Sequence, residues 1–422
     1  MIPSLGRSWL VWACAALFFG YQFLLRVSPS VMTQELMANY QVDACALGTL
    51  TSFYFYAYAL LQLPVGTLLD KFGPQRLLIF AALLCTGGSF LFSSAETIML
   101  ASLGRFIIGA GSAFGFLSCM KVGALWFPPQ RISMVVGFTV FLGFMGAMSG
   151  TYPMSFLVDE LGWRQAVWAT AGGGVFLAIL IAFVVRDHPP KNLRTYIEKH
   201  HAFGNPSLSI WEGLKIILKK GQTWLLAFYG FMMFVPLVGF ADLWGVPFLI
   251  QVHHMDKQSA SFSISALYLG VAIGTPLLAF LSDHLKQFKL TLLGSALGAL
   301  FPFMIIVYGP DLPLFAIIFT LFSAGILLGG QFMAYSIVTE INPLSVSGMA
   351  TGFQNMVCLL SGVIFQPFIG WLLDLFWKNA YENGIRLYST ATYQMALTSV
   401  IVALLFAILS SLFIREAYPT RD

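Results

Sequence analysis

The sequence predicts an all-α membrane protein with twelve transmembrane helices. Of its 422 residues, 58% are hydrophobic and only 9% are charged, whereas soluble domains carry roughly 25% charged residues. A helix that crosses the ~30 Å hydrocarbon layer needs about 20 mostly apolar residues. The chain holds twelve such runs, bounded by charged residues, Gly or Pro, and these leave no room for a separate soluble domain.

The apolar runs form two sets of six on either side of one long polar segment. We therefore expect an N-terminal six-helix half at residues 1–185, a cytoplasmic linker at 186–221 and a C-terminal six-helix half at 222–422. In chain order, the expected helices cover about 8–31, 44–69, 76–94, 98–125, 131–158, 164–185, 222–250, 258–282, 289–308, 313–338, 347–373 and 388–414.

The first run is interpreted as a retained helix and not as a cleaved secretory signal. It continues through Gln22 and Arg26 to about Val31, with no small-residue cleavage site ahead of a soluble domain. The cysteines are odd in number, scattered and never arranged as CxxC, so we interpret them as packing residues. They are Cys14, Cys45, Cys85, Cys119 and Cys358.

The two halves repeat each other at an offset of about 214 residues. The matching pairs share one order along the chain, which is typical of parallel repeats that rock around a midplane site. The pairs include Asp70 with Asp283, Arg76 with Lys289, Gly111 with Gly325, Pro129 with Pro343, and Asp159 with Asp374.

The basic residues favour cytoplasmic termini, because cytoplasmic loops of membrane proteins are enriched in Lys and Arg. With both termini inside, most basic residues fall in cytoplasmic segments, and only Arg164, Lys257, Lys378 and Arg386 lie in outer loops. Short loops and the lack of an N-glycosylation sequon favour a bacterial inner membrane. The expected location is therefore that membrane, crossed many times, with both termini in the cytoplasm.

The loop after the second expected helix, GTLLDKFGPQR from Gly66 to Arg76, resembles the loop motif of the major facilitator superfamily. Gly66 would permit close helix approach, Asp70 stands where a helix enters the cytoplasm, and Gly73 would make the turn. Paired with a cation or a helix N-terminus, Asp70 would latch one conformation of the bundle. The resemblance thus implies a latch of Gly66, Asp70, Gly73, Arg76 and the repeat-related Asp283; an ordinary capped loop is the alternative.

Further motifs extend the resemblance along the chain. The segments Arg105–Gly111, Trp126–Arg131 and Gly162–Arg164 are similar to family motifs, and Gly-x-Gly spacing permits close helix packing. In the second half, Ala279 and Lys286 replace the glycines of the loop motif, so a symmetrical latch is not implied. The family resemblance implies two pseudo-symmetric six-helix halves around a central solute site. Drug antiporters of the family usually carry a Gly-Pro dipeptide in the fifth helix, which is missing here.

Three cations lie within expected helices, where charges are costly and mark functional sites by default. Gln22 and Arg26 share one helix face, and Arg105 lies about 10 Å into its span at 1.5 Å per residue. Two guanidinium groups could bind one anion bidentately. The alternatives are snorkelling for Arg26, a structural or proton-coupling role for Arg105, and snorkelling or a salt bridge for Lys121. With Arg26 late in its first helix, the chain also resembles family transporters of organic phosphates and carboxylates.

Asp242 is the only acidic residue well inside an expected span. A buried carboxylate near a cation could carry the coupling proton, and Arg105 could take part in that coupling. The alternative is a static counter-ion to Arg26 across the two halves.

Aromatic and amide residues complete the predicted solute site. In membranes such groups also hydrogen-bond neighbouring helices, which is the alternative for each of them. The predicted solute-binding residues are Gln22, Arg26, Tyr54, Tyr58, Arg105, Lys121, Gln331, Tyr335, Gln354 and Asn355.

The sequence favours a transporter over other classes. It has no P-loop, HExxH or nucleophile-elbow pattern, so no enzyme is expected, and no cofactor is expected. The adjacent His253 and His254 diverge on a helix and have no third ligand nearby, so no metal is expected. In the linker, Lys215 and its basic neighbours predict an amphipathic stretch on anionic lipid, and positive-inside bias explains the charge without nucleic acid.

We therefore predict a monomeric secondary transporter of a small organic anion that uses protons for coupled import. The alternatives are an exporter of a metabolite, a drug or a polycarboxylate siderophore, and a transport-like solute sensor.

Overall fold

The computed structural model describes residues 5–190, 210–382 and 384–416. Within this part of the chain, 12 helices are long and apolar enough to cross a membrane. Their ends agree with the expected spans to within a few residues, so the predicted fold class is confirmed. The exact division at residues 185 and 221 stays a prediction, since 191–209 of the expected linker and the outermost residues of both termini lie outside the described residues.

Six spans make up the first half. They are α1 with the short 3₁₀ segment η1 (Gly6–Val27 and Ser28–Val31), α3 (Ala44–Phe72), α4 (Pro74–Ser94), α5 with α6 (Ile98–Ser112 and Phe114–Trp126), α7 with α8 (Ile132–Ser149 and Tyr152–Leu161) and α9 (Trp163–Val184).

Six spans make up the second half. They are α12 with η3 and α13 (Gly221–Val235, Pro236–Trp244 and Gly245–Val252), α14 (Lys257–Leu285), α15 (Phe288–Tyr308), α16 with η4 and α17 (Leu314–Leu328, Gly329–Phe332 and Met333–Glu340), α18 (Ser347–Leu375) and α19 (Thr390–Phe413).

Short elements join these spans. Only α11 (Ile210–Leu218) was expected, as the amphipathic stretch around Lys215; the others were not predicted. The amphipathic α2 (Thr33–Tyr40) buries Leu36 and is capped by Gln41, whose φ of 51° is left-handed. A two-stranded hairpin, β1 (Tyr381–Glu382) and β2 (Ile385–Arg386), precedes α19. The remaining short elements are η2 (Pro129–Arg131) and η5 (Leu344–Val346).

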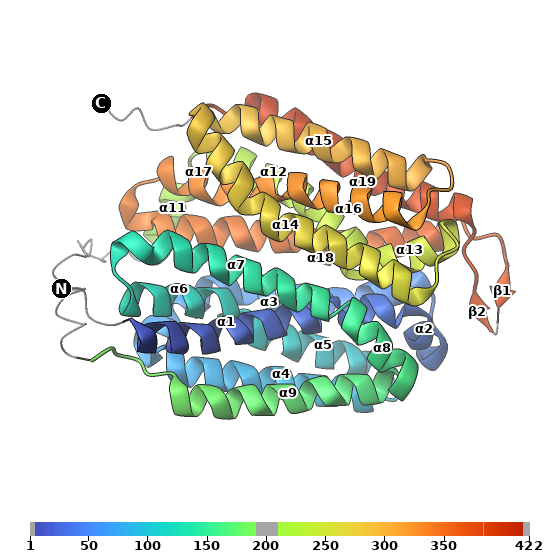
Figure 1. Cartoon of the computed structure of the whole chain (residues 1–422), viewed down its shortest axis with the longest axis horizontal. Coiled ribbons are helices and arrows are strands. Elements are labelled where there is room, and N and C mark those ends of the chain that lie inside the picture. The colour runs from blue at the N-terminus through green and yellow to red at the C-terminus, as the bar shows by residue number, and fades with distance from the viewer. Residues whose placement is uncertain (1–4, 191–209, 383, 417–422) are drawn as a thin grey trace.

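The two halves lie side by side with their helices running along a common direction (Figure 1). We call the end that carries α2, β1 and β2 the hairpin end, and the opposite end, which carries α11, the linker end. Across the halves, α3 packs against α18 and α7 packs against α14. The contact between the halves therefore runs along these two helix pairs.

Several spans are broken where the sequence removes regular backbone hydrogen bonds. Proline lacks an N–H and clashes with the preceding turn, and Pro153 follows the break between α7 and α8. Pro236 begins η3, a nine-residue π-helical segment that ends at Trp244. π-Helical turns often occur at functional sites, and η3 carries Asp242. The break thus determines where that carboxylate lies.

Small residues bring α5 close to its neighbours, as the Gly-x-Gly spacing predicts. A Cβ built at Gly109 would lie 2.1 Å from the Tyr54 carbonyl oxygen, and one at Gly111 would lie 2.6 Å from that of Ala81. Neither position accepts a side chain without helix movement. The predicted close packing is confirmed, and it holds α5, which carries Arg105, against α3 and α4.

Candidate functional site

A buried ion pair joins the two halves at the centre of the molecule. Arg26, at the end of α1, lies with its Nε 3.0 Å from Asp242 Oδ2, and its Nη2 donates to Asp242 Oδ1 at 3.4 Å. The two side chains are only 2% and 0% exposed. Of the two predicted roles for Asp242, the structure shows the contacts of a counter-ion to Arg26. The role in proton transfer stays a prediction.

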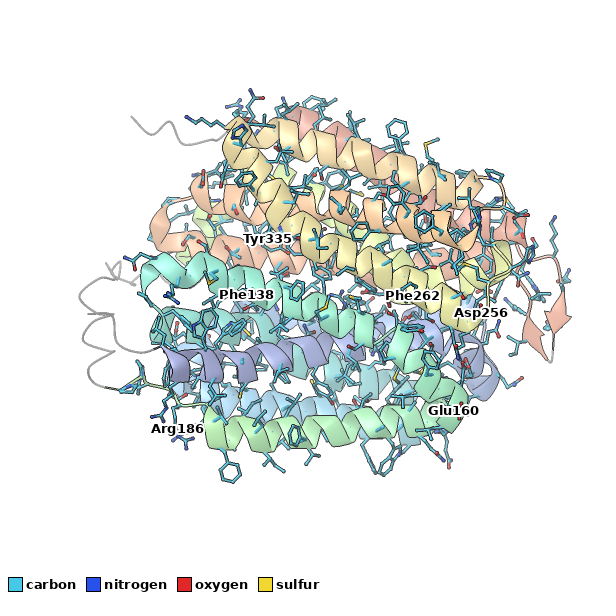
Figure 2. The ribbon with its side chains drawn as sticks, in the orientation of Figure 1. Phe138, Glu160, Arg186, Asp256, Phe262 and Tyr335 are labelled. Carbon is cyan, nitrogen blue, oxygen red and sulfur yellow. The ribbon has the colours of Figure 1, made fainter. Side chains whose placement is uncertain are left out.

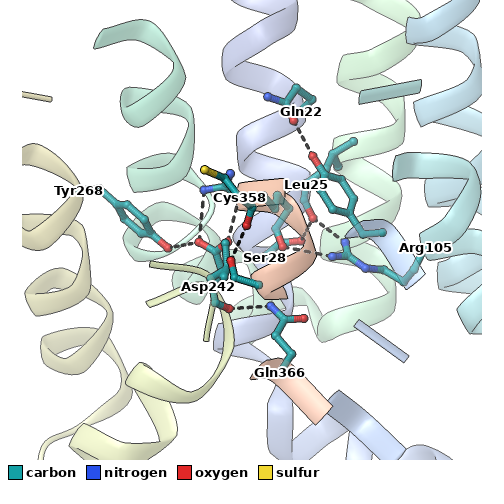
Figure 3. Close-up of polar contacts among 12 residues, drawn as sticks. Gln22, Leu25, Ser28, Arg105, Asp242, Tyr268, Cys358 and Gln366 are labelled. Carbon is teal, nitrogen blue, oxygen red and sulfur yellow. Dashed lines mark hydrogen bonds and ion pairs between the residues drawn. The ribbon is translucent and has the colours of Figure 1, made fainter. Parts of the chain in front are cut away.

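Tyr268 of α14 completes this ion pair (Figure 3). Its hydroxyl donates to Asp242 Oδ1 at 2.6 Å, and its ring stacks on Phe144 of α7 with centroids 6.3 Å apart. Asp242 is therefore held both by a cation from the first half and by a hydroxyl from the second. Sequence analysis did not single out Tyr268; a tyrosine in the middle of an apolar span is the signal that could have found it.

Gln366 holds the π-helical segment that carries Asp242 (Figure 3). Its Nε2 donates to the Val238 carbonyl oxygen at 2.8 Å, and its own backbone carbonyl accepts from Trp244 Nε1 at 3.0 Å. Both ends of η3 are thus tied to α18. Gln366 was also missed, although a buried amide beside Pro367 marks an irregular point in a span.

Arg105 does not point at the ion pair but at the backbone of α1. Its guanidinium donates to the carbonyl oxygens of Leu25 at 2.7 Å and of Arg26 at 3.2 Å, and it lies 5.1 Å from the Tyr54 ring centroid. The last carbonyls of a helix lack intrahelical partners, so the bonds satisfy groups at the end of α1. These contacts are those of a structural residue, which was one alternative for Arg105. That Arg105 contacts the solute or takes part in proton coupling stays a prediction.

Gln22 and the tyrosines of α3 form one predicted set that the structure does bring together. Tyr54 donates to Gln22 Oε1 at 2.5 Å, and the Tyr54 and Tyr58 rings lie 5.8 Å apart. Gln22 lies on α1 one turn before Arg26. These side chains therefore lie on the Arg26 side of the bundle centre.

A second polar cluster lies nearer the linker end and includes Tyr335, which Figure 2 shows at the boundary between the halves. Its hydroxyl donates to Asn355 Oδ1 at 2.9 Å, and Asn355 Nδ2 donates across the halves to Gln62 Oε1 at 2.8 Å. Gln354 instead donates to the Leu226 carbonyl oxygen at 3.0 Å. Gln331 is 2% exposed, and neither of its amide atoms has a hydrogen-bond partner among the described residues.

Phe144 connects the ion pair with this second cluster. Its ring centroid lies 5.6 Å from Phe23, which contacts Arg26, and 5.9 Å from Phe332, whose ring stacks on Tyr335. An aromatic path thus leads from Arg26 to Tyr335.

Lys121 lies away from the ion pair, where it binds the predicted latch carboxylate. Its Nζ is 2.6 Å from Asp70 Oδ1, with side chains 32% and 69% exposed. Lys121 is thus the cationic partner that was expected for Asp70. Of the alternatives for Lys121, the structure shows the salt bridge. Its role in solute binding stays a prediction.

The rest of the latch segment packs on Asp187, which sequence analysis missed. Gly73 has a φ of +79° and abuts the Asp187 carboxylate, which also accepts from Gln75 N at 2.8 Å. A Cβ at Gly66 would meet nothing within 4 Å, so the close approach expected there is not made in this structure. Arg76 is exposed at the start of α4, and Asp283 is exposed near the end of α14.

The histidine pair joins no metal-ligand cluster. Within the described residues, no three His, Cys, Asp or Glu side chains are grouped to hold a metal ion. A ring nitrogen of His253 lies 2.9 Å from the Ile306 carbonyl oxygen.

Twelve membrane spans in two halves, with a buried polar site where the halves meet, define a multi-pass transport protein. The Major Facilitator Superfamily model matches residues 10–366, and the chain belongs to that family.

Similar proteins agree with this assignment. The chain is 26% identical to the "Uncharacterized transporter YybO" of Bacillus subtilis, over 83% of this chain and 84% of the relative. It is 23% identical to the "Probable galactarate/D-glucarate transporter GudP" of Escherichia coli, over 93% and 92%. The solved structure of an inward-facing bacterial homologue of the human lysosomal transporter Spinster shares the fold, with a TM-score of 0.74 at 16% identity and 97% coverage of both chains.

Proposed function

We propose that the chain imports a small organic anion together with protons by alternating access. The observation that carries the proposal is the buried Arg26–Asp242 pair, because it joins the two halves that must move relative to each other. A buried cation with one counter-ion suits an anionic solute that can take the place of that counter-ion.

Arg26 links solute binding to proton binding in this proposal. When the solute anion binds the Arg26 guanidinium, the buried Asp242 carboxylate loses its counter-charge. Removing one partner of a buried ion pair costs about 3 to 5 kcal/mol, and proton uptake by Asp242 removes that cost. Solute and proton therefore bind together, and Tyr268, whose hydroxyl can also accept a hydrogen bond, keeps Asp242 in place during the exchange.

Unpartnered amides supply further contacts for the solute. Within the described residues, Gln22 Nε2, Gln62 Nε2 and both amide atoms of Gln331 are buried without a hydrogen-bond partner. A buried polar atom without a partner is costly, so bound solute or water that satisfies these atoms would be stabilised. Tyr335 and Asn355 would line the route toward the linker end.

The name of one relative fits this chemistry. Galactarate and D-glucarate, after which GudP is named, are dicarboxylates that carry several hydroxyl groups. Such a molecule offers a carboxylate to Arg26 and hydroxyls to the amides. We propose a solute of this kind, without assigning a particular compound.

We also propose the placement of the protein in the membrane. The linker end would face the cytoplasm and the hairpin end the outside of a bacterial inner membrane, because most Lys and Arg residues belong to the linker end or the linker itself. The protein would act as a monomer.

Uptake by purified protein in liposomes tests the function. We expect labelled D-glucarate, or another small organic anion found by screening, to accumulate when the outside is acidic, and a protonophore to abolish the accumulation. Choline serves as a cationic control. Solute binding without transport would support the sensor alternative, and outward movement only would support the exporter alternative.

A further inference from the structure

The hairpin ends of α3 and α14 begin in the same way, although they belong to different halves. Asp43 precedes α3 and accepts a hydrogen bond from Ala46 N at 2.9 Å; Asp256 precedes α14 and accepts one from Ser259 N at 2.9 Å. Each is an N-cap that satisfies one of the free N–H groups of a helix start. The remaining N–H groups of α3 find partners in the opposite half.

Asp374, at the end of α18, binds the start of α3 directly. Its Oδ2 accepts from Cys45 N at 2.8 Å, and its Oδ1 lies 3.4 Å from Ala44 N. A carboxylate at a helix N-terminus is stabilised by both the free N–H groups and the helix dipole. The second half thus holds the first turn of a helix of the first half.

Residues of the hairpin region hold Asp374 in this position. Arg386 of β2 lies with Nη1 2.9 Å from Asp374 Oδ1 and 3.6 Å from Asp43 Oδ2. The Tyr388 hydroxyl donates to Asp374 at 2.5 Å and accepts from Ala44 N at 3.1 Å. Burial, and then the nearby Asp374 carboxylate, raise the pKa of Tyr388, so its hydroxyl stays protonated and able to donate.

The repeat-related carboxylate, Asp159, makes the corresponding contact on the other side of the bundle. Lys257, the first residue of α14, places its Nζ 2.9 Å from Asp159 Oδ1 and 2.7 Å from Glu35 Oε1 of α2. Here a lysine side chain takes the place of the backbone N–H groups. Figure 2 shows Glu160 and Asp256, the chain neighbours of Asp159 and Lys257, at this same end of the molecule.

Directly below these contacts the backbones of α3 and α18 touch. A Cβ at Gly48 would lie 2.4 Å from the Gln366 carbonyl oxygen, and one at Gly370 would lie 2.3 Å from that of Ala44. This approach is possible only because both residues are glycines. The hairpin end is therefore closed by two backbones in contact and by polar groups above them.

We infer that Asp374 and Asp159 are the two arms of a gate that keeps the hairpin end of the bundle closed. Each arm lies within the last three residues of its span, and each binds the first turn of the helix that begins the corresponding span of the opposite half. Opening the hairpin end separates both arms from their partners at once. Water can replace the partners, because Asp159 is 37% and Asp374 13% exposed, so the gate is reversible.

The gate predicts that weakening either arm opens the same end. Cys45 lies at the start of α3 and is partly exposed, whereas Cys14, Cys85, Cys119 and Cys358 are buried. Its labelling rate by a membrane-impermeant maleimide therefore reports on opening. A hydrogen bond to a charged group contributes enough for about a tenfold change in an equilibrium, so we expect about tenfold faster labelling in Asp159→Asn. That arm is the cleaner test, because Asp374 adjoins Cys45 and would change its reactivity directly.

Spin-label distances supply the second measurement and need no solute. With labels at Thr49 of α3 and Leu375 of α18, Asp159→Asn, Lys257→Gln and Asp374→Asn should each populate longer distances. Glu160→Gln and Lys378→Gln, exposed neighbours of the two arms, are the matched controls and should match the wild type. The double variant Asp159→Asn with Lys257→Gln should open no further than Lys257→Gln alone, because Lys257→Gln already removes the contact with Asp159.

Unchanged labelling and unchanged distances in the variants of both arms would overturn the gate, whether or not the protein imports an anion. A change in the Asp374 variant alone would reduce the gate to one arm and overturn the two-armed inference. Failure of anion uptake with both measurements positive would refute the proposed function and leave the gate standing.

Discussion

Arg26 and Asp242 are each buried in a membrane span and each supplies the other's counter-charge. The pair crosses the two halves and is held on one side by Tyr268. The two charges have different expected roles, with Asp242 carrying the proton and Arg26 binding the anion.

Asp242→Asn is expected to abolish accumulation driven by a pH gradient while exchange of labelled for unlabelled solute persists. The amide mimics the protonated carboxyl, so the protein can bind solute and alternate but cannot release a proton. Both modes should be measured on one proteoliposome preparation, with wild-type protein as control. Full gradient-driven accumulation in the variant would eliminate Asp242 as the proton carrier, whereas loss of both modes would favour a purely structural counter-ion.

Arg26→Ala and Arg105→Ala should each lower solute affinity far more than Arg164→Ala, because only the first two lie at the bundle centre. All three variants should also lower the thermal midpoint, because Arg26 pairs with Asp242, Arg105 binds the Leu25 carbonyl and Arg164 binds that of Ala95. Solute affinity, and not the midpoint, therefore separates their roles. Equal solute affinities for all three variants would contradict the anion site.

At the scale of elements, irregular backbone positions the charged groups. The π-helical η3 brings Asp242 to Arg26, and Gln366 of α18 binds η3 near both of its ends. The Gly66–Arg76 segment similarly depends on contacts outside itself, with Lys121 and Asp187. A substitution in either supporting element is therefore expected to act on the charged group that it holds.

Gln366→Leu should destabilise the protein by about 1 to 3 kcal/mol, since it leaves the buried Val238 carbonyl without its partner. It should also weaken solute binding, because Asp242 lies on the released segment. Asn342→Leu is the matched control: it too removes a buried amide from a carbonyl, that of Val338, but away from η3. Thermal unfolding and solute titration of both variants check this; an equal loss of affinity in the two would contradict a specific role for η3.

Asp70→Asn should shift the balance between conformations while largely sparing solute affinity, because Asp70 is exposed and distant from Arg26. Lys121→Gln should shift it in the same direction, since it breaks the same ion pair. Spin-label distances between the linker ends of α3 and α18 measure the shift. Normal transport rates with unchanged distances in both variants would retire the latch, and a large loss of affinity in Lys121→Gln alone would restore Lys121 to the solute site.

For the whole molecule, closure of the hairpin end depends on how closely α3 and α18 approach. The two helices lie some three hundred residues apart in the chain, so no local sequence pattern predicts that they come into contact. Glycine at two positions makes the contact possible.

Gly48→Ala should hold the hairpin end open, because the added methyl group would lie 2.4 Å from a backbone oxygen of α18. Transport should fall strongly, and Cys45 should label faster. Gly87→Ala lies in the middle of the neighbouring helix α4 with no atom within 4 Å of the added group, so it is the matched control for the intrinsic effect of alanine in a helix. Similar transport and labelling in the two variants would show that the contact does not limit closure.

The sequence by itself determined the spans, the two halves and the charges inside them. Lipid cannot satisfy backbone polar groups, so each span must be an apolar helix of fixed minimum length, and that rule is local in sequence. The same rule made Arg26, Arg105 and Asp242 conspicuous. It also explains why α2 and the β1–β2 hairpin were missed, since both lie beyond the spans, where no such constraint applies.

Only the tertiary structure decided which groups meet. Arg26 pairs with Asp242 and Asp374 binds Cys45 N, in each case across the two halves, and the guanidinium of Arg105 donates to backbone carbonyls of α1. Such pairings depend on the relative positions of helices that are not consecutive in the chain, and on irregular segments such as η3. Hydropathy and spacing describe each helix alone, so they predict that a buried charge needs a partner. They gave the Arg26–Asp242 pair only as one of two alternatives, and the partner of Asp374 not at all.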